Sequence, residues 1–409
     1  MTPPHLLGTF FKQKSIMSIL GDITTEEFLR DYWQKKPLVI RGAFPDFEMP
    51  FDAGELAGLA LETDSPARII LEKGEAPDNK PWTVKYPPFT DEDFTSTPET
   101  HWTFLVNDLE RYYPELGNLI EPFRFIPDWR IDDLMVSYAA DQGSVGPHVD
   151  AYDVFLIQGE GKRRWQVVTD PDYPTELLPD SQLAILKHFK HDEEWLLDTG
   201  DMLYLPPNMP HLGVADGVCM TFSVGFRAPD TLGLTQSWLE SFSNDQNNAE
   251  TKKLITKRFN DAERKTQESS GEIASEDIQK LSSLIMDLVK NQEQQLPIFL
   301  GKYLTETKNS ELEDEDFSLQ TLSGKFSKKA DYERQSWTRI SYIEDEQNKS
   351  IHLFAAGLHV TLPQTERAAI QAFCEHYYYG AETLKPLFEY DEFTAMFKDL
   401  LKSGSLLPS

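Results

Sequence analysis

Residues 146–165 read GPHVDAYDVFLIQGEGKRRW and contain the densest group of polar functional side chains in the chain. A His-x-Asp pair opens the stretch and an apolar run follows it. Alternate side chains of a β-strand share one face, so His148, Asp150 and Tyr152 are expected to point the same way. A His-x-Asp pair is common by itself, and a third ligand is needed before it predicts a metal site.

The second half of this stretch combines Gly-Glu-Gly with three consecutive cations. Residues 159–161 are expected to form a turn, and the strand after it should run antiparallel to the His-x-Asp strand. Alternation then places Arg163 on the same face as Trp165 and turns Lys162 and Arg164 the other way. We therefore predict that Arg163 points inward and that its two cationic neighbours are solvated.

Residues 198–213, DTGDMLYLPPNMPHLG, supply a candidate third ligand. A tight turn, a strand over Met202–Leu205 and three prolines lead to His211. Two histidines and one carboxylate leave about three open positions on an octahedral iron, as in non-haem Fe(II) oxygenases, but they also suit a catalytic zinc. One large class of iron oxygenases uses 2-oxoglutarate. The far carboxylate of that co-substrate is well matched by a buried guanidinium such as that of Arg163.

The chain is strongly acidic. Its 409 residues include 68 Asp plus Glu against 39 Lys plus Arg, a formal net charge of −29. This charge disfavours a nucleic acid as partner and favours a basic protein, although acidity also serves solubility alone. Cys219 and Cys374 lie in apolar runs and are expected to be buried thiols of a cytoplasmic protein. No membrane span and no secretory leader are predicted.

The sequence pattern changes near residue 229. Before it, short strands alternate with Gly- and Pro-rich turns, as in a β-sandwich or barrel. After it, helical periodicity dominates, and a helix with a Ser275 N-cap is expected to carry an apolar stripe that packs within the chain or against a second copy. The stripe consists of Ile278, Leu281, Leu284, Ile285 and Leu288. An acidic linker near residue 311 precedes a hairpin around residues 347–349 and a further helix, which indicate a small winged-helix-like module.

Two segments resemble a known protein family. Residues 130–167, RIDDLMVSYAADQGSVGPHVDAYDVFLIQGEGKRRWQV, and residues 198–215, DTGDMLYLPPNMPHLGVA, are similar to the JmjC-type ribosomal oxygenases. Within that family, the similarity is greatest to the bacterial hydroxylases of an arginine in a 50S ribosomal protein. The resemblance begins at FLRDYWQKKPLVIRGAF, residues 28–44, and thins towards the C-terminus.

The resemblance implies a mainly β catalytic domain with the double-stranded β-helix, or jelly-roll, fold of the cupins. This domain, together with an N-terminal region of helix and strand, is expected at residues 1–228. An α-helical dimerisation domain is expected at residues 229–310, followed by the acidic linker and a small α+β winged-helix-like domain at residues 311–409. A homodimer is therefore expected. The last domain is acidic, so direct DNA binding is not expected.

The resemblance also implies roles for individual residues. His148, Asp150 and His211 would be the catalytic Fe(II) ligands. Arg163, assisted by Ser137, would bind the distal carboxylate of the co-substrate 2-oxoglutarate. O2 would take the coordination position that remains.

The implied substrate pocket comprises Asp133, Met135, Tyr152 and Ser223. Asp133, Met135 and Ser137 have one strand parity, so all three are able to face the barrel interior. Asp133 would pair with a substrate guanidinium, and Met135 and Tyr152 would line its aliphatic stem. Without the resemblance, the simpler interpretation of Asp133 is a carboxylate in a turn, and that of Met135 is an ordinary core residue.

The implied reaction hydroxylates the β-carbon of an arginine in protein sixteen of the large ribosomal subunit and converts 2-oxoglutarate and O2 into succinate and CO2. Two alternatives for this chain stay open. In the first, it hydroxylates a histidine in another ribosomal protein, as related oxygenases do. In the second, it is a non-catalytic cupin that binds metal as a scaffold and turns over no 2-oxoglutarate.

Overall fold

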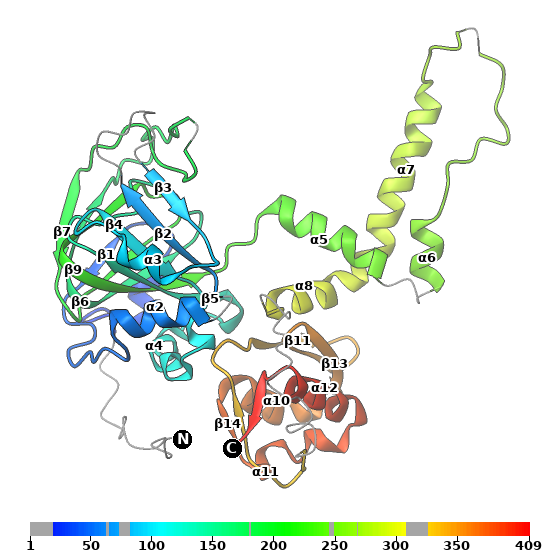
Figure 1. The fold of residues 1–409 in the computed structure, drawn as a ribbon. Coiled ribbons are helices and arrows are strands. Elements are labelled where there is room, and N and C mark those ends of the chain that lie inside the picture. The colour runs from blue at the N-terminus through cyan, green and yellow to red at the C-terminus, as the bar shows by residue number, and fades with distance from the viewer. Residues whose placement is uncertain are drawn as a thin grey trace. The chain divides into compact units, whose positions relative to one another are not determined.

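The computed structural model describes residues 19–62, 65–72, 82–179, 181–244, 249–267, 269–307 and 326–409. The chain forms two compact units (Figure 1). The first comprises the chain up to Ala228 with Gln335–Trp337, and the second comprises Pro229–Arg334 with Thr338–Ser409. The start of the chain, where no leader was predicted, and the predicted acidic linker near residue 311 lie outside the described residues.

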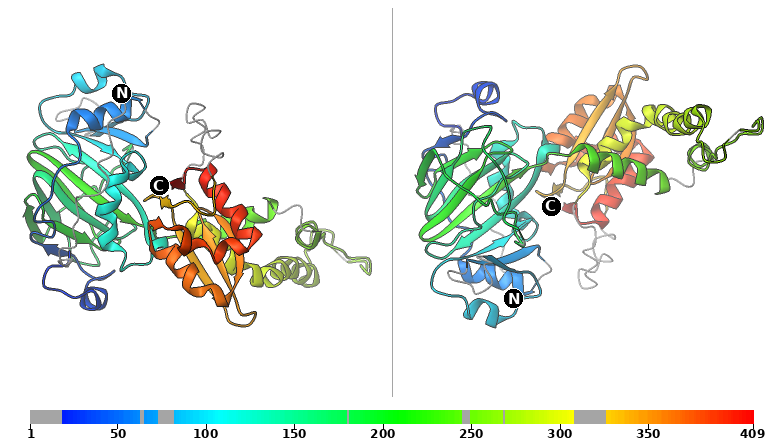
Figure 2. Two further views of the ribbon diagram at one scale, coloured as in Figure 1. Left: turned by 90° about the horizontal axis from the view of Figure 1, so that it is seen from below. Right: turned by 90° about the horizontal axis from the view of Figure 1, so that it is seen from above.

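The first unit is built on one antiparallel sheet of nine strands. The strands are β1 (Leu38–Ile40), β2 (Ala67–Glu72), β3 (Trp82–Lys85), β4 (Trp102–Val106), β5 (Ile131–Ala139), β6 (Val154–Val167), β7 (Glu193–Leu197), β8 (Met202–Leu205) and β9 (His211–Phe226). Neighbours follow the order β1-β8-β6-β9-β5-β4-β2-β3, and β7 also pairs with β6. Most neighbours are therefore distant in the chain. Figure 2 shows the strands, coloured blue to green, from two further sides.

Short helices accompany the sheet and help to close its apolar core. They are α1 (Thr25–Asp31), α2 (Ala53–Glu62), α3 (Asp91–Thr95) and α4 (Gly117–Ile120), with 3₁₀ turns at Leu109–Arg111, Pro114–Leu116, Glu121–Phe123 and Asp128–Arg130. α1 begins with a capping box, in which Thr24 Oγ1 accepts from the N–H of Glu27 at 3.1 Å and Glu27 Oε2 accepts from the N–H of Thr24 at 3.0 Å. The cap sets the start of the helix. Phe28 then packs against the rings of Phe155 and Tyr204 in the core.

The predicted turn at residues 159–161 is wrong. β6 passes through this segment as one continuous strand, and β9 pairs with it on both sides of the segment. The pairing register shifts between Gln158 and Lys162, which is the mark of a bulge. Gly161 has φ +63°, and a Cβ there would lie 2.2 Å from the carbonyl oxygen of Val218. Glycine therefore allows a bulge here, and the chain continues instead of reversing.

The His-x-Asp pair does not lie on a regular strand, so the predicted strand is wrong here, although His148, Asp150 and Tyr152 do point into one pocket as expected. His148 forms a single antiparallel bridge with His211, in which each N–H donates to the other carbonyl oxygen at 3.0 Å. A loop then leads to β6, and the N–H of Asn208 donates to the carbonyl oxygen of Asp150 at 2.7 Å. Main-chain contacts with β9 and the loop before it thus position both side chains.

Asp153 ends this loop, and its side chain is fully buried. Tyr204 Oη donates to its Oδ1 at 2.7 Å, while Gln34 Nε2 and Arg130 Nη2 each donate to its Oδ2 at 3.0 Å. The carboxylate therefore ties the loop that carries Asp150 to β8, to α1's C-terminal side and to the start of β5.

We expect Asp153→Ala to lower the free energy of unfolding of the first unit by about 3 kcal/mol, because it leaves Arg130 and Tyr204 without their buried acceptor. Denaturant titration measures this change. Asp216→Ala is the matched control, since Asp216 pairs with Arg164 at the surface and its loss should cost less than about 1 kcal/mol. Equal effects of the two substitutions would contradict this view of Asp153.

The second unit contains helices followed by two small sheets. Its helices are α5 (Thr231–Asn244), α6 (Ala249–Ile255), α7 (Ser275–Gln292), α8 (Leu296–Thr305), α10 (Arg367–Glu375), α11 (Ala381–Leu384) and α12 (Asp391–Lys402), with 3₁₀ turns at Glu293–Gln295, Gln364–Glu366 and Leu387–Glu389. Its strands are β10 (Tyr332–Arg334), β11 (Ile340–Asp345), β12 (Ser350–Ala355), β13 (Leu358–Pro363), β14 (Tyr378–Tyr379) and β15 (Leu406–Pro408). β11 and β12 form the hairpin predicted around residues 347–349. None of the helices in the described part of the chain is both long and apolar enough to cross a membrane.

The long helix α7 differs from its prediction in one detail. Ser275 is the first residue inside the helix, and the N-cap is Ala274, whose side chain has no acceptor. The predicted N-cap is therefore wrong. The predicted apolar stripe is present, and Ile278, Leu281 and Ile285 are exposed by 50%, 44% and 66%. Nothing within the described residues covers this part of the stripe.

Candidate active site

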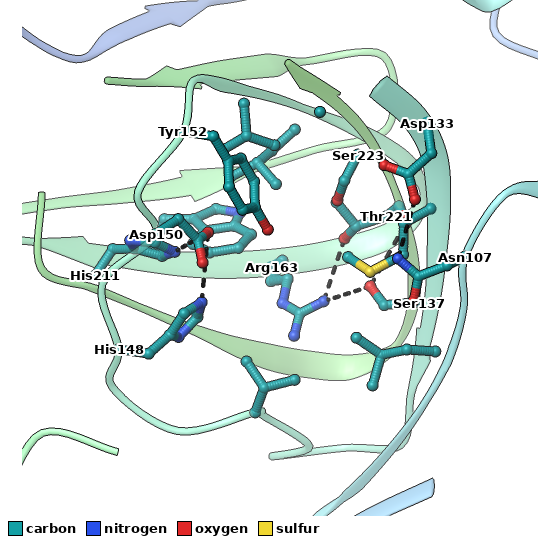
Figure 3. Close-up of a pocket in the computed structure, with 17 residues that line it drawn as sticks. Asn107, Asp133, Ser137, His148, Asp150, Tyr152, Arg163, His211, Thr221 and Ser223 are labelled. Carbon is teal, nitrogen blue, oxygen red and sulfur yellow. Dashed lines mark hydrogen bonds and ion pairs between the residues drawn. The ribbon is translucent and has the colours of Figure 1, made fainter. Parts of the chain in front are cut away.

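His148, Asp150 and His211 converge on one point of the first unit (Figure 3). One potential ligand atom from each lies within 4.8 Å of the others. Asp150 Oδ2 is 3.7 Å from Nε2 of His148 and 3.6 Å from Nε2 of His211. Within the described residues this is the one group of three or more His, Cys, Asp or Glu side chains with such geometry.

Hydrogen bonds decide which ring nitrogen of each histidine faces Asp150. His148 Nδ1 lies 2.9 Å from the carbonyl oxygen of Gly146, and His211 Nδ1 lies 2.9 Å from that of Met209. A carbonyl oxygen only accepts, so each Nδ1 carries the proton. Each Nε2 then presents a lone pair to the point of convergence, which is the tautomer that a metal ligand requires.

Burial and mutual charge set the protonation of this group. Burial, with the charge of His148 next, lowers the pKa of His211 to about 4, so its imidazole is neutral at physiological pH. At Asp150, burial acts to raise the pKa of the carboxyl group. The interactions of this carboxylate with His148 and His211 outweigh burial, so the pKa of Asp150 lies below its ordinary value. The same attraction outweighs burial at His148 and raises its pKa. An anionic carboxylate between two imidazoles is a donor set that fits a divalent metal.

Arg163 lies in the same pocket, 3% exposed. Its Nη1 donates to Ser137 Oγ at 3.0 Å and to Thr221 Oγ1 at 3.4 Å, and its Nη2 donates to the carbonyl oxygen of Gly213 at 3.4 Å. All of these acceptors are neutral, and Nε has no hydrogen-bond partner. Burial lowers the pKa of Arg163, yet a guanidinium stays charged in proteins.

A buried cation without a counter-ion is costly, so it indicates a site for an anion. Among the described residues no carboxylate forms an ion pair with Arg163. Gly213 helps to make this space, because a Cβ there would lie 2.9 Å from Arg163 Nε and 2.7 Å from the Trp165 ring. The prediction that Arg163 points inward is confirmed, as is the solvation of Lys162 and Arg164, whose side chains are 53% and 41% exposed.

All nine residues singled out from the sequence line this one pocket: Asp133, Met135, Ser137, His148, Asp150, Tyr152, Arg163, His211 and Ser223. The strand parity predicted for Asp133, Met135 and Ser137 on β5 is therefore confirmed. Tyr152 is 42% exposed, whereas Asp133 is 7% exposed.

Eight further residues line the pocket: five are hydrophobic, and the other three, which sequence reasoning missed, are Asn107, Thr221 and Gly225. Thr221 lies two residues before Ser223 on β9, so strand alternation was a usable signal for it. Asn107 directly follows β4 and carries no local signal. Only the pairing of β4 with β5 brings it to Asp133, where its Nδ2 donates to Asp133 Oδ2 at 3.0 Å.

The antiparallel β unit and its His-Asp-His group define the class of protein. Residues 118–234 match the JmjC domain family, and residues 283–407 match the ROXA-like winged helix family. The predicted fold class, a cupin-like β domain followed by helices and a winged-helix-like domain, is therefore confirmed.

Relatives place the chain within this class. It is 31% identical over 388 residues to the ribosomal protein uL16 3-hydroxylase of Escherichia coli, an alignment covering 92% of this chain and 96% of that protein. It is 40% identical over 275 residues to a probable ribosomal oxygenase of Haemophilus influenzae. This alignment covers 66% of this chain and 65% of that protein, so the chain spans slightly under two thirds of the length of that relative. The chain belongs to the JmjC-type ribosomal oxygenases.

Solved structures agree with this assignment. The structure of YcfD, a ribosomal oxygenase from Escherichia coli in complex with cobalt and 2-oxoglutarate, has a TM-score of 0.72 at 29% identity and covers 94% of this chain and 98% of YcfD. A second structure of YcfD holds cobalt and succinic acid, with the same TM-score, identity and coverage.

Proposed function

We propose that this chain is an Fe(II)- and 2-oxoglutarate-dependent hydroxylase that modifies the β-carbon of an arginine in ribosomal protein uL16. The observation that carries the proposal is the placement, in one pocket, of a three-ligand group and a buried arginine without a counter-ion. The name of the Escherichia coli relative supplies uL16 and carbon 3, which is the β-carbon.

His148, Asp150 and His211 would hold the metal through the two Nε2 atoms and one carboxylate oxygen. A metal held there would supply the oxidation of a substrate C–H bond to an alcohol by O2, coupled to the conversion of 2-oxoglutarate into succinate and CO2. The protein's own part is to orient the ligands through the Gly146 and Met209 carbonyl groups and to keep the site shielded from water. The cobalt complexes of YcfD support this reading.

The distal carboxylate of 2-oxoglutarate would pair with Arg163. Ser137 and Thr221 already accept hydrogen bonds from Nη1 of Arg163, so they hold the guanidinium in place. Nη2 donates one hydrogen bond to Gly213 and keeps its second N–H for the co-substrate. A guanidinium presents paired donors to a carboxylate, which a lysine in this position could not do.

The substrate arginine would enter past Tyr152 and place its stem along Met135, with Ser223 in the same wall. Asp133 would receive its guanidinium. A net charge of −29 would favour the approach of a basic ribosomal protein and disfavour direct DNA binding. Cys219 and Cys374 are both buried, as expected of the cysteines of a cytoplasmic protein.

A homodimer formed through α7 is part of this proposal, since the exposed stripe needs an apolar partner. We expect Ile285→Glu to weaken self-association by about a hundredfold or more, because it places a charge in an apolar contact. Sedimentation over a range of concentrations measures this. Glu276→Gln, on a residue of the same helix that pairs with Lys280 at the surface, is the control. A monomeric wild type would contradict the proposal.

Incubation with purified uL16, Fe(II), 2-oxoglutarate and O2, followed by peptide mass spectrometry, tests the reaction. The expected result is a gain of one oxygen atom on an arginine, with fragment ions that place it on the β-carbon. Modification of a histidine in another ribosomal protein would establish the alternative substrate. A complete absence of succinate with all ribosomal proteins would favour the scaffold.

A further inference from the structure

Asn107 and Asp133 form a hydrogen-bonded pair in the wall of the pocket (Figure 3). The N–H of Asn107 donates to the carbonyl oxygen of Pro66 at 2.9 Å, so its backbone is fixed just beyond β4. Its Nδ2 donates to Asp133 Oδ2 at 3.0 Å. The pair therefore joins a residue that follows β4 to one on β5.

Asp133 lies within a bulge of β5. The pairing of β5 with β9 shifts between Ile131 and Leu134, and the N–H of Leu134 donates to the side chain of Glu110 at 3.0 Å. Glu110 is only 1% exposed, so this contact is shielded from water. The bulge is thus held by a buried side chain.

The hydrogen bond determines which atom of the Asn107 amide faces Asp133. A carboxylate at neutral pH only accepts hydrogen bonds, so the NH2 group must face it and Asn107 Oδ1 must point elsewhere. Among the described residues none donates a hydrogen bond to Asn107 Oδ1 or to Asp133 Oδ1. A Cβ at Gly225 would lie 3.2 Å from Asp133 Oδ1, so the glycine leaves this oxygen uncovered.

The two free oxygens make a receptor for a group that carries several N–H donors. A guanidinium has five N–H donors in a planar fork and no acceptor, so it is able to serve two oxygens on neighbouring residues. A neutral imidazole has a single N–H donor, and it would leave one of the two oxygens unsatisfied. A buried acceptor without a donor is costly, and such a penalty is a strong source of specificity.

We propose that Asn107 is a specificity-determining residue, which holds Asp133 with its NH2 group and offers its own carbonyl oxygen as the second acceptor for the substrate guanidinium. The inference deepens the proposed function and rests on an arginine substrate. It explains how the pocket selects arginine over histidine, the residue modified in the alternative reaction.

The test measures binding, so it does not depend on turnover. The probes are Nα-acetyl-arginine methylamide and its lysine and histidine counterparts, added to the full chain loaded with Mn(II) and 2-oxoglutarate. Mn(II) is paramagnetic and accelerates the relaxation of protons on a bound probe nearby, which yields both the affinity and the proximity to the metal. The variants are Asn107→Leu, which keeps the volume, and Asn107→Ala. Asn118→Leu is the matched control, because Asn118 is an exposed asparagine on α4 of the same unit.

We expect the wild type and Asn118→Leu to bind the arginine probe about tenfold or more tightly than the histidine probe. Both Asn107 variants should lose about tenfold in affinity for the arginine probe and change by less than about twofold for the histidine probe. Their thermal stabilisation by 2-oxoglutarate should equal that of the wild type, since no hydrogen bond links Asn107 to Arg163. This readout separates lost recognition from misfolding.

Retention of the arginine preference in both Asn107 variants would overturn the inference, as would a wild type that binds all three probes equally. Failure of the proposed function looks different. If the wild type prefers the arginine probe through Asn107 but leaves every arginine of uL16 unmodified, the role of Asn107 in binding is supported and the proposed reaction is contradicted.

Discussion

Asp150→Ala is expected to abolish succinate formation from 2-oxoglutarate, by on the order of 10³-fold or more, as removal of one essential catalytic group does. Asp150 is the single anionic member of the three-residue group, and both histidine Nε2 atoms lie within 3.7 Å of its Oδ2. Without the carboxylate, two neutral imidazoles remain as ligands. Metal affinity should therefore fall together with activity, and calorimetric titration with Mn(II) measures it.

The matched control for this experiment is Asp216→Asn, which removes a surface carboxylate of the same unit. It should leave succinate formation and Mn(II) affinity close to those of the wild type. Asp150→Ala with full metal affinity and full turnover would mean that a different group holds the metal. Circular dichroism of both variants shows whether the fold is retained.

Arg163→Met should have two opposite effects. The concentration of 2-oxoglutarate needed for half-maximal turnover should rise about a hundredfold or more, because the co-substrate carboxylate would lose its buried cation. The protein without co-substrate should gain about 1–3 kcal/mol in its free energy of unfolding, because Met replaces an uncompensated buried charge with a side chain of similar length. Initial rates at varied 2-oxoglutarate measure the first effect and denaturant titration measures the second.

Arg164→Met is the matched control, since Arg164 lies on the same strand and pairs at the surface with Glu194 and Asp216. It should alter neither the 2-oxoglutarate requirement nor the stability by more than a small amount. The combination of a stabilised protein and a weakened co-substrate site distinguishes a functional cation from a structural one. A destabilised Arg163→Met with an unchanged requirement would assign Arg163 to the fold alone.

Local sequence patterns predicted several features of the site correctly for physical reasons. Strand alternation acts over two or three residues, so Arg163 was placed inward even though the turn assigned before it does not exist. The strand Met202–Leu205 and the approach to His211 were predicted from turn and proline signals. The parity of Asp133 and Ser137 follows from β5 in the same way.

Features that depend on pairing between distant strands were not predictable. Residues 159–161 include two glycines, which suit a turn and a bulge equally. The segment forms a bulge because β9 pairs with β6 on both sides of it. His148 was expected on a strand, whereas its single bridge to His211 and the loop beyond it depend on a residue 63 positions later in the chain. Asn107 has no distinguishing neighbours in the sequence, and the register of β4 against β5 alone gives it a role.

The sequence by itself thus identified nine of the side chains that line the site, because ligand types, glycines and strand alternation are local properties. The tertiary structure decided how those side chains meet. The tautomers of His148 and His211, the missing counter-ion of Arg163 and the orientation of the Asn107 amide all follow from atoms contributed by other strands and loops. Hydrogen bonds and burial between distant segments exist only once the chain is folded, so no local pattern encodes them.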